Sequence, residues 1–95
     1  MKWAVLKITD GDITVHKLLR GMYGGYLYGD SWALNSGIKH VRVEEEHYVV
    51  EGFSGSQYVC PKECEGISVI MAAAIQDFKE KADVEVVKME DYLDS

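Results

Sequence analysis

The strongest constraint on the fold is an amphipathic segment that runs from about Gly66 to Ala82. Its apolar residues recur at steps of three and four and form one stripe: Ile67, Ile70, Met71, Ala74, Ile75, Phe78 and Ala82. This spacing is typical of a helix that buries one face. Ser68, or a residue just before it, is suited to cap the start. The segment therefore predicts a helix that packs against another element.

Runs with the two-residue period of strands surround this helix. Residues 2–9 are apolar on both alternating sets, which favours a strand covered on both faces. The Asp10-Gly11 pair then predicts a tight turn, so that residues 2–19 form a hairpin. Further strands are expected at residues 38–44 and 47–53 as a second hairpin, at 58–60 and 84–87, and as short pieces at 26–28 or 31–34. The acidic end, residues 89–95, is expected to fray unless Tyr92 and Leu93 dock on the rest of the domain.

These elements predict one small domain over residues 1–95 with an α+β fold. We expect an antiparallel sheet of about four to six strands, with the main helix of residues 66–82 packed on one face. A chain of 95 residues can hold one hydrophobic core, and its 47% of hydrophobic residues are enough to fill that core.

The charge balance bears on the class of partner. The chain has 10 Lys and Arg against 16 Asp and Glu, and the formal net charge of −6 disfavours direct binding to nucleic acid or to a membrane surface. It suits a protein partner with a basic surface. No stretch has the apolar length of a signal peptide or a membrane span, and two cysteines are too few for a disulfide scaffold. We therefore expect a cytoplasmic protein with free thiols.

Metal binding has weak candidates in Cys60, Cys64, His40 and His47. Their side chains are zinc ligands by type, but Cys60 and Cys64 have the looser C-x3-C spacing and no second cysteine pair follows. We expect small buried or inert thiols, with no metal and no cofactor. Glu63 and Glu65 flank Cys64 and oppose the thiolate that redox chemistry needs.

No stretch matches a catalytic motif. Residues 52–56, Gly-Phe-Ser-Gly-Ser, approach the nucleophile elbow but lack its last glycine, and the glycine-rich stretch after residue 20 lacks the Lys and the Ser or Thr of a phosphate loop. That stretch is instead notable for aromatic side chains of the kind that dominate binding hot spots: Tyr23, Tyr26, Tyr28 and Trp32. The alternative for about half of them is that they fill the core from irregular strands. A second candidate surface is the acidic cluster Glu44, Glu45 and Glu46, at the expected tip of the second hairpin.

We therefore predict a small noncatalytic protein-interaction or inhibitor module that uses one or both of these surfaces. The small size, acidity and lack of a catalytic motif are similar in kind to small phage-encoded or accessory regulatory proteins, although no motif assigns a family. One alternative is an enzyme or small-ligand binder that uses His16, His40, His47, Cys60 or Asp30. Another is an acidic mimic of nucleic acid that blocks a basic groove. An exposed strand edge would also allow a homodimer.

Overall fold

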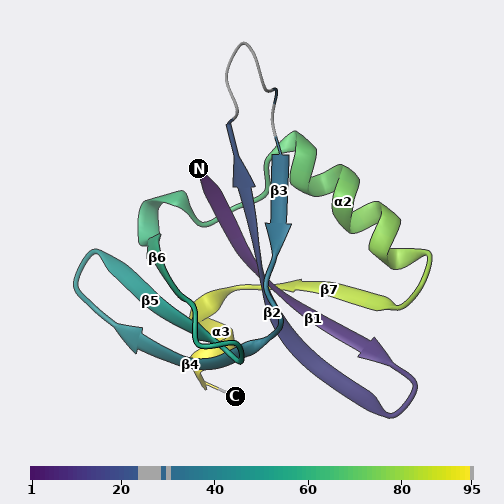
Figure 1. Ribbon diagram of the computed structural model, residues 1–95, viewed down its shortest axis with the longest axis horizontal. Helices are drawn as coiled ribbons and strands as arrows, with labels where there is room; N and C mark the ends of the chain where they lie inside the picture. Colours follow the sequence, from purple (N-terminus) through teal and green to yellow (C-terminus); the bar gives the residue numbers. More distant parts are fainter. Residues whose placement is uncertain (24–28, 30, 95) are drawn as a thin grey trace.

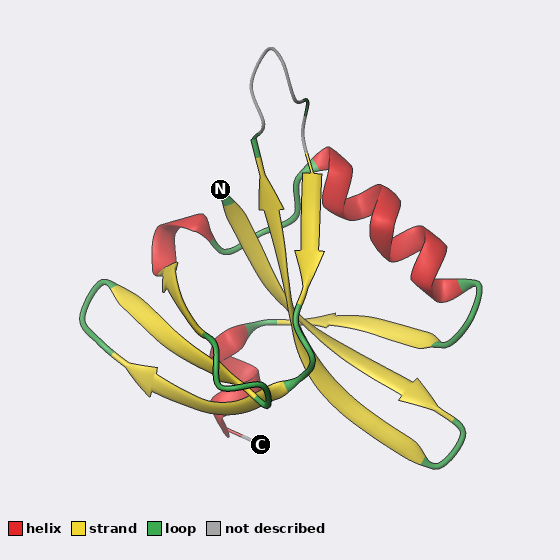
Figure 2. Cartoon of the chain, in the orientation of Figure 1, coloured by secondary structure: helices red, strands yellow, loops and turns green. Residues whose placement is uncertain are grey.

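The structure is a computed structural model that describes residues 1–23, 29 and 31–94. Its strands form two antiparallel sheets, and two α-helices and a short 3-10 helix complete the described chain (Figures 1 and 2). The larger sheet has the strand order β3-β2-β1-β7, and the smaller sheet has the order β4-β5-β6.

The larger sheet is built on a hairpin of two long strands. β1 (Lys2–Asp10) pairs with β2 (Ile13–Met22), and the turn between them contains Gly11 at a φ of 63°, which glycine adopts without steric cost. β3 (Ser31–Leu34) joins the outer side of β2, and β7 (Asp83–Val87) joins the outer side of β1. The predicted hairpin is confirmed, and its second strand continues to Met22.

The smaller sheet follows the predicted second hairpin and the short strand after it. It consists of β4 (Ile38–Val43), β5 (His47–Gly52) and β6 (Gln57–Pro61). The turn between β4 and β5 carries the acidic cluster, and the Glu44 N–H donates to the His47 carbonyl at 2.9 Å. These bounds agree with the sequence prediction to within a few residues.

β1 is the centre of the molecule, because it is buried on both faces. Trp3 and Val5 face a core that contains residues of β2, the smaller sheet and the C-terminal helix: Leu18, Ile38, Val50, Cys60 and Met89. Ala4 and Leu6 face the opposite core, which contains Leu19, Met71 and Ile75. A fully buried large apolar side chain contributes roughly 1.5–3 kcal/mol, so the two cores hold the layers on either side of the larger sheet. The prediction of a strand covered on both faces is confirmed.

The chain changes sheets at Asn35, which lies between β3 and β4. The Asn35 N–H donates to the Leu18 carbonyl at 3.1 Å, and its side-chain Oδ1 accepts from the Leu18 N–H at 2.8 Å. Oδ1 also accepts from the Gly37 N–H at 3.2 Å, while Nδ2 donates to the Gly37 carbonyl at 3.2 Å. The side chain thus satisfies backbone groups where regular strand pairing ends.

The main helix, α2 (Val69–Lys79), covers one face of the larger sheet with Met71, Ala74 and Ile75. Ser68 is its N-cap, and the Ser68 side chain accepts a hydrogen bond from the Met71 N–H. The helix is shorter than the predicted 66–82, because Ser68 is extended, with a ψ of 172°, and the chain leaves the helix at Glu80. The capping prediction is confirmed.

The C-terminal residues form a second, short helix, α3 (Met89–Asp94), beside the opposite face of the sheet. Its first residue, Met89, is fully buried. The sequence predicts a frayed acidic tail over residues 89–95, whereas residues 89–94 form this helix with one side chain in the core.

The α+β class and the packing of one main helix on a sheet are confirmed. The arrangement of the strands differs from the single sheet of four to six strands that the sequence suggests, since the seven described strands divide into two sheets. The division has a physical cause. Trp3 and Val5 are apolar and lie on the face of the larger sheet that α2 does not cover, and the smaller sheet and α3 bury these side chains.

Candidate functional site

Two of the aromatic candidates, Tyr23 and Trp32, lie at the end of the larger sheet where β2 finishes and β3 begins (Figure 1). Trp32 pairs across the strands with Gly21, and Tyr23 directly follows β2. Both side chains are accessible, with Tyr23 61% exposed and Trp32 41% exposed. Tyr26 and Tyr28, together with Asp30, lie outside the described residues.

The Trp32 indole is fixed against the main helix. Its ring meets the Phe78 ring edge to face, with centroids 5.2 Å apart and an interplanar angle of 83°. Next to it, the helix approaches the sheet so closely that a Cβ on Gly21 would lie 2.7 Å from the Met71 sulfur. We define the aromatic end as Tyr23 and Trp32, of which Trp32 rests on a packed support.

The acidic hairpin tip occupies a different part of the molecule. Glu45 and Glu46 are exposed, while Glu44 accepts a hydrogen bond from the Arg42 guanidinium at 2.7 Å. A depression of about 280 Å³ lies beside the tip, lined by Glu45, Glu46, Lys62 and Glu63. Figure 1 places the β4–β5 turn and the β3 end on different sides of the molecule, so the structure does not bring the two candidate surfaces together.

The cysteine and histidine candidates do not converge. Cys60 lies in the core, whereas His47 pairs with the next residue of β6 and so points to the opposite face of the smaller sheet. His40 pairs with Glu51, four residues along β5 from His47, so the two histidines are offset by about 13 Å along the strand direction and also lie on different strands. Within residues 1–23, 29 and 31–94, no three His, Cys, Asp or Glu side chains gather closely enough to hold a metal ion.

The Cys60 thiol is chemically quiet. Burial raises its pKa to about 12, with Arg20 lowering and Glu65 raising it to smaller extents. The thiolate form that attacks disulfides and binds metals is therefore scarce at neutral pH. Both Cys60 and Cys64 are free thiols.

A polar depression of about 290 Å³ lies between the larger sheet and α3, and sequence reasoning missed it. Lys7, His16 and Glu85 contribute to it from neighbouring strands, and Asp91 and Tyr92 from α3. The His16 ring lies 4.8 Å from the Tyr92 ring. Burial, and secondarily the charge of Lys7, lowers the His16 pKa, so the imidazole favours its neutral form.

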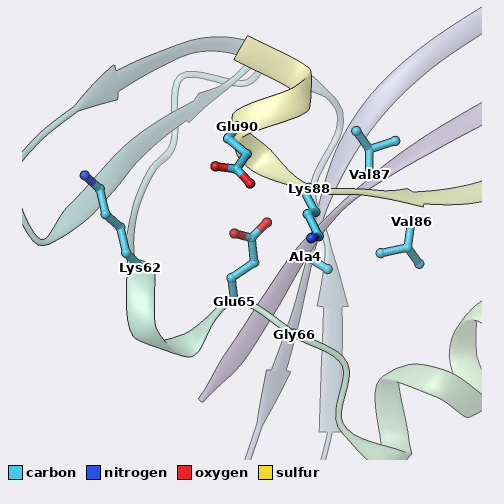
Figure 3. A pocket seen from close by; sticks show the side chains of 8 residues that line it. All are labelled: Ala4, Lys62, Glu65, Gly66, Val86, Val87, Lys88 and Glu90. Atoms are coloured by element: carbon cyan, nitrogen blue, oxygen red, sulfur yellow. The ribbon is translucent and has the colours of Figure 1, made fainter. Parts of the chain in front are cut away.

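A larger depression of about 440 Å³ lies at the edge of the larger sheet (Figure 3). We call it the sheet-edge depression. Ala4, Gly66 and Val86 contribute small or apolar groups, and the charged side chains around them are Lys62, Glu65, Lys88 and Glu90. Figure 3 shows the carboxylates of Glu65 and Glu90 turned toward each other.

Neither depression has a local sequence signal. Lys7 and Glu85 meet through β1–β7 pairing, and Ala4 meets Val86 only because the last strand returns to the first. Alternation and helical spacing predict elements, but not which distant elements pair.

In the part of the chain that the structure describes, no helix combines the length and the apolar character needed to span a membrane.

Comparison of the chain with models of protein families, with curated proteins and with solved structures finds no match.

Proposed function

We propose that this chain is a small noncatalytic interaction module that binds a partner protein through the aromatic end, Tyr23 and Trp32. The observation that carries the proposal is an exposed tryptophan held in place: Trp32 is 41% exposed while its ring packs edge to face on Phe78. Large aromatic side chains that bury area without losing much conformational freedom are frequent anchors of protein interfaces.

The contrast with the second tryptophan supports this choice. Trp3 is fully buried, and its indole N–H donates to the Pro61 carbonyl at 2.7 Å. Its exposure and bonding are explained by the fold alone. Trp32 still presents a large aromatic surface to solvent after packing on Phe78, and a partner that covers it would gain from burying that surface.

The charge distribution favours a partner with a basic surface. The net charge is −6, and Glu45, Glu46 and Glu63 gather around one depression at the acidic tip. Such a field speeds encounter with a cationic surface and disfavours nucleic acid. The nucleic-acid-mimic form of the proposal uses the same residues, and it requires that complex formation weaken steeply as salt concentration rises.

The enzyme alternative has less support among the described residues. Of its polar candidates, only His16 lines one of the three depressions, while Cys60 is buried with a raised pKa, and His40 and His47 lie on the outer face of the smaller sheet. A reducing cytoplasm is part of our proposal, because both cysteines are free.

The proposal is tested with Trp32→Ala and Tyr23→Ala, and with Val59→Ala as a matched control. Val59 is 60% exposed on the smaller sheet, away from the aromatic end. A partner captured by the wild-type chain from its native cell extract should bind the two aromatic variants at least about tenfold more weakly. The control should bind normally.

Fluorescence gives a second measurement, since Trp32 is exposed and Trp3 is not. Iodide should quench Trp32 in the free chain, and bound partner should protect it. Unchanged affinity in both aromatic variants, or quenching that the partner leaves unaltered, would remove the aromatic end as the contact surface.

A further inference from the structure

We propose that the sheet-edge depression binds a free α-amino acid with an aliphatic side chain. The site is separate from the aromatic end, and the inference does not depend on the proposed function. It stands on the cavity, its apolar floor and the arrangement of unpaired charges around it.

The cavity exists because two segments leave β1 in different ways. β7 pairs with β1 only from Val5 to Thr9, and its chain then turns into α3. At the other end, Glu65 forms a parallel bridge with Trp3, and the Gly66 N–H donates to the Trp3 carbonyl at 2.9 Å. Ala4 lies between these two contacts, and its small side chain leaves the hollow of about 440 Å³ open. That volume is within the range of small-molecule sites.

The floor of the hollow is apolar. Ala4 and Val86 lie on the face of the sheet that α2 covers, yet Val86 remains 46% exposed. Gly66 adds backbone without a side chain. An aliphatic side chain laid on this floor would remove the exposed part of Val86 from water.

The charged groups around the floor are not neutralised by each other. Among the described residues the structure contains one ion pair, between Arg42 and Glu44, so Glu65, Lys88 and Glu90 have no ion-pair partner. The Glu65 Oε2 atom accepts one hydrogen bond, from the Met89 N–H at 2.7 Å. Lys62 is directed elsewhere, since its ammonium group lies 5.2 Å from the centre of the Tyr48 ring.

These charges define the ligand chemistry. Figure 3 shows the Glu65 and Glu90 carboxylates facing each other, and Lys88 and Val86 line the same depression. An α-ammonium group would bind the two carboxylates, an α-carboxylate would bind Lys88, and the side chain would cover the exposed part of Val86. A free aliphatic amino acid carries these three groups together.

A ligand series separates the three contributions. We would titrate the ¹⁵N-labelled full chain with L-leucine, L-leucinamide, 4-methylpentanoate and glycine, and follow its amide resonances. L-leucine has few atoms and the site is open, so we expect a Kd of about 1 mM. The largest shifts should occur at Gly66, Val86 and Lys88. Each of the other compounds lacks one group and should bind about tenfold more weakly.

Three variants test the residues. Glu90→Gln and Lys88→Gln each remove one exposed charge, and Val86→Asp replaces the apolar floor of the depression with a carboxylate. Each should weaken L-leucine binding about tenfold, while the amide spectrum of the free variant should remain that of a folded chain. Glu45→Gln, which removes an exposed carboxylate outside this depression, should bind L-leucine normally.

The proposal fails if L-leucine shifts none of the resonances around the depression, or if all three variants bind it as tightly as the wild type. Tighter binding of L-leucinamide than of L-leucine would show that the site prefers a simple cation to a zwitterion, and it would overturn the proposed ligand class. Since Trp32 does not line the sheet-edge depression, the effect of Trp32→Ala on partner binding is an independent measurement.

Discussion

The Glu65 carboxylate accepts a hydrogen bond from the Met89 backbone N–H at 2.7 Å, and so joins segments 24 residues apart in the chain. Glu65 also lies against β1, through its backbone bridge to Trp3. One residue therefore connects the central strand to α3, whose first N–H groups have no partner within the helix. The contact helps explain why an acidic C-terminal segment folds instead of fraying.

Replacing this carboxylate should loosen the C-terminal helix. A hydrogen bond to a charged group contributes about 1.5–3 kcal/mol, so Glu65→Ala should lower the free energy of unfolding by about that amount. Glu65→Gln keeps an acceptor without the charge and should lose less. Hydrogen exchange at the Met89 and Tyr92 amides should accelerate in the Ala variant before exchange in β1 does.

Glu63→Ala is the matched control for this pair, because Glu63 is exposed and lies two residues away. It should leave the unfolding free energy within about 0.5 kcal/mol of the wild type. Equal destabilisation by Glu63→Ala and Glu65→Ala would contradict a specific role for the carboxylate contact.

Asn35 is the second residue whose side chain holds backbone together, here at the corner between the two sheets. Asn35→Ala would leave the Leu18 and Gly37 N–H groups without their acceptor in a site that is 8% exposed. We expect a loss of about 2–5 kcal/mol in unfolding free energy. Urea denaturation followed by tryptophan fluorescence measures this loss, and Ser36→Ala, at an exposed neighbour, should have little effect. A loss under about 0.5 kcal/mol in Asn35→Ala would show that the corner does not need the side chain.

The same corner shows what sequence reasoning can and cannot supply. Alternation placed β1, the two hairpins and β6 correctly, and the stripe with Ser68 located α2, because these signals are local. The role of Asn35 depends on Leu18 and Gly37 meeting it in space. From the sequence alone, where that contact is not visible, the strands are predicted to form a single meandering sheet.

The candidate sites follow the same division. The aromatic segment gave Trp32 and Tyr23 as candidate binding residues. Both are exposed in the structure, and their use in binding stays a prediction. The sheet-edge depression could not be predicted, because Ala4, Glu65 and Val86 come from the first strand, a connecting segment and the last strand. The burial of Met89 could not be predicted either, since a single methionine in an acidic tail has no periodic pattern.

The two cysteines should differ in reactivity. Burial raises the pKa of Cys60 to about 12, and at pH 8 its thiolate is roughly a thousandfold scarcer than that of an ordinary thiol. Cys64 is only half-buried. In the native chain an aromatic disulfide reagent should therefore modify Cys64 first and reach Cys60 only after denaturant is added.

Cys64→Ser isolates Cys60 and makes the comparison direct. This variant should react slowly when native and rapidly when unfolded. Fast native reaction of the Cys64→Ser chain would mean that Cys60 is accessible, and the redox and metal interpretations would have to be reopened.

His16 should make the chain less stable in mild acid. Burial, and then the charge of Lys7, lowers the His16 pKa in the folded chain below the usual value, while in the unfolded chain the same imidazole has a pKa of about 6.5. As the pH falls below about 6.5, the unfolded chain binds the proton more readily, so the stabilising effect of a neutral His16 is present above that pH and is lost as the pH falls through the folded pKa. Unfolding free energies should be measured from about pH 7.5 to about pH 5. The wild type should lose more stability toward low pH than His16→Gln does.

In Lys7→Gln the His16 imidazole resonances should titrate at a higher pH than in the wild type, because one of the two causes of the shift is removed. The polar depression would need a different electrostatic description if wild-type His16 titrated above about 6.5, since the carboxylates of Glu85 and Asp91 would then outweigh both burial and Lys7.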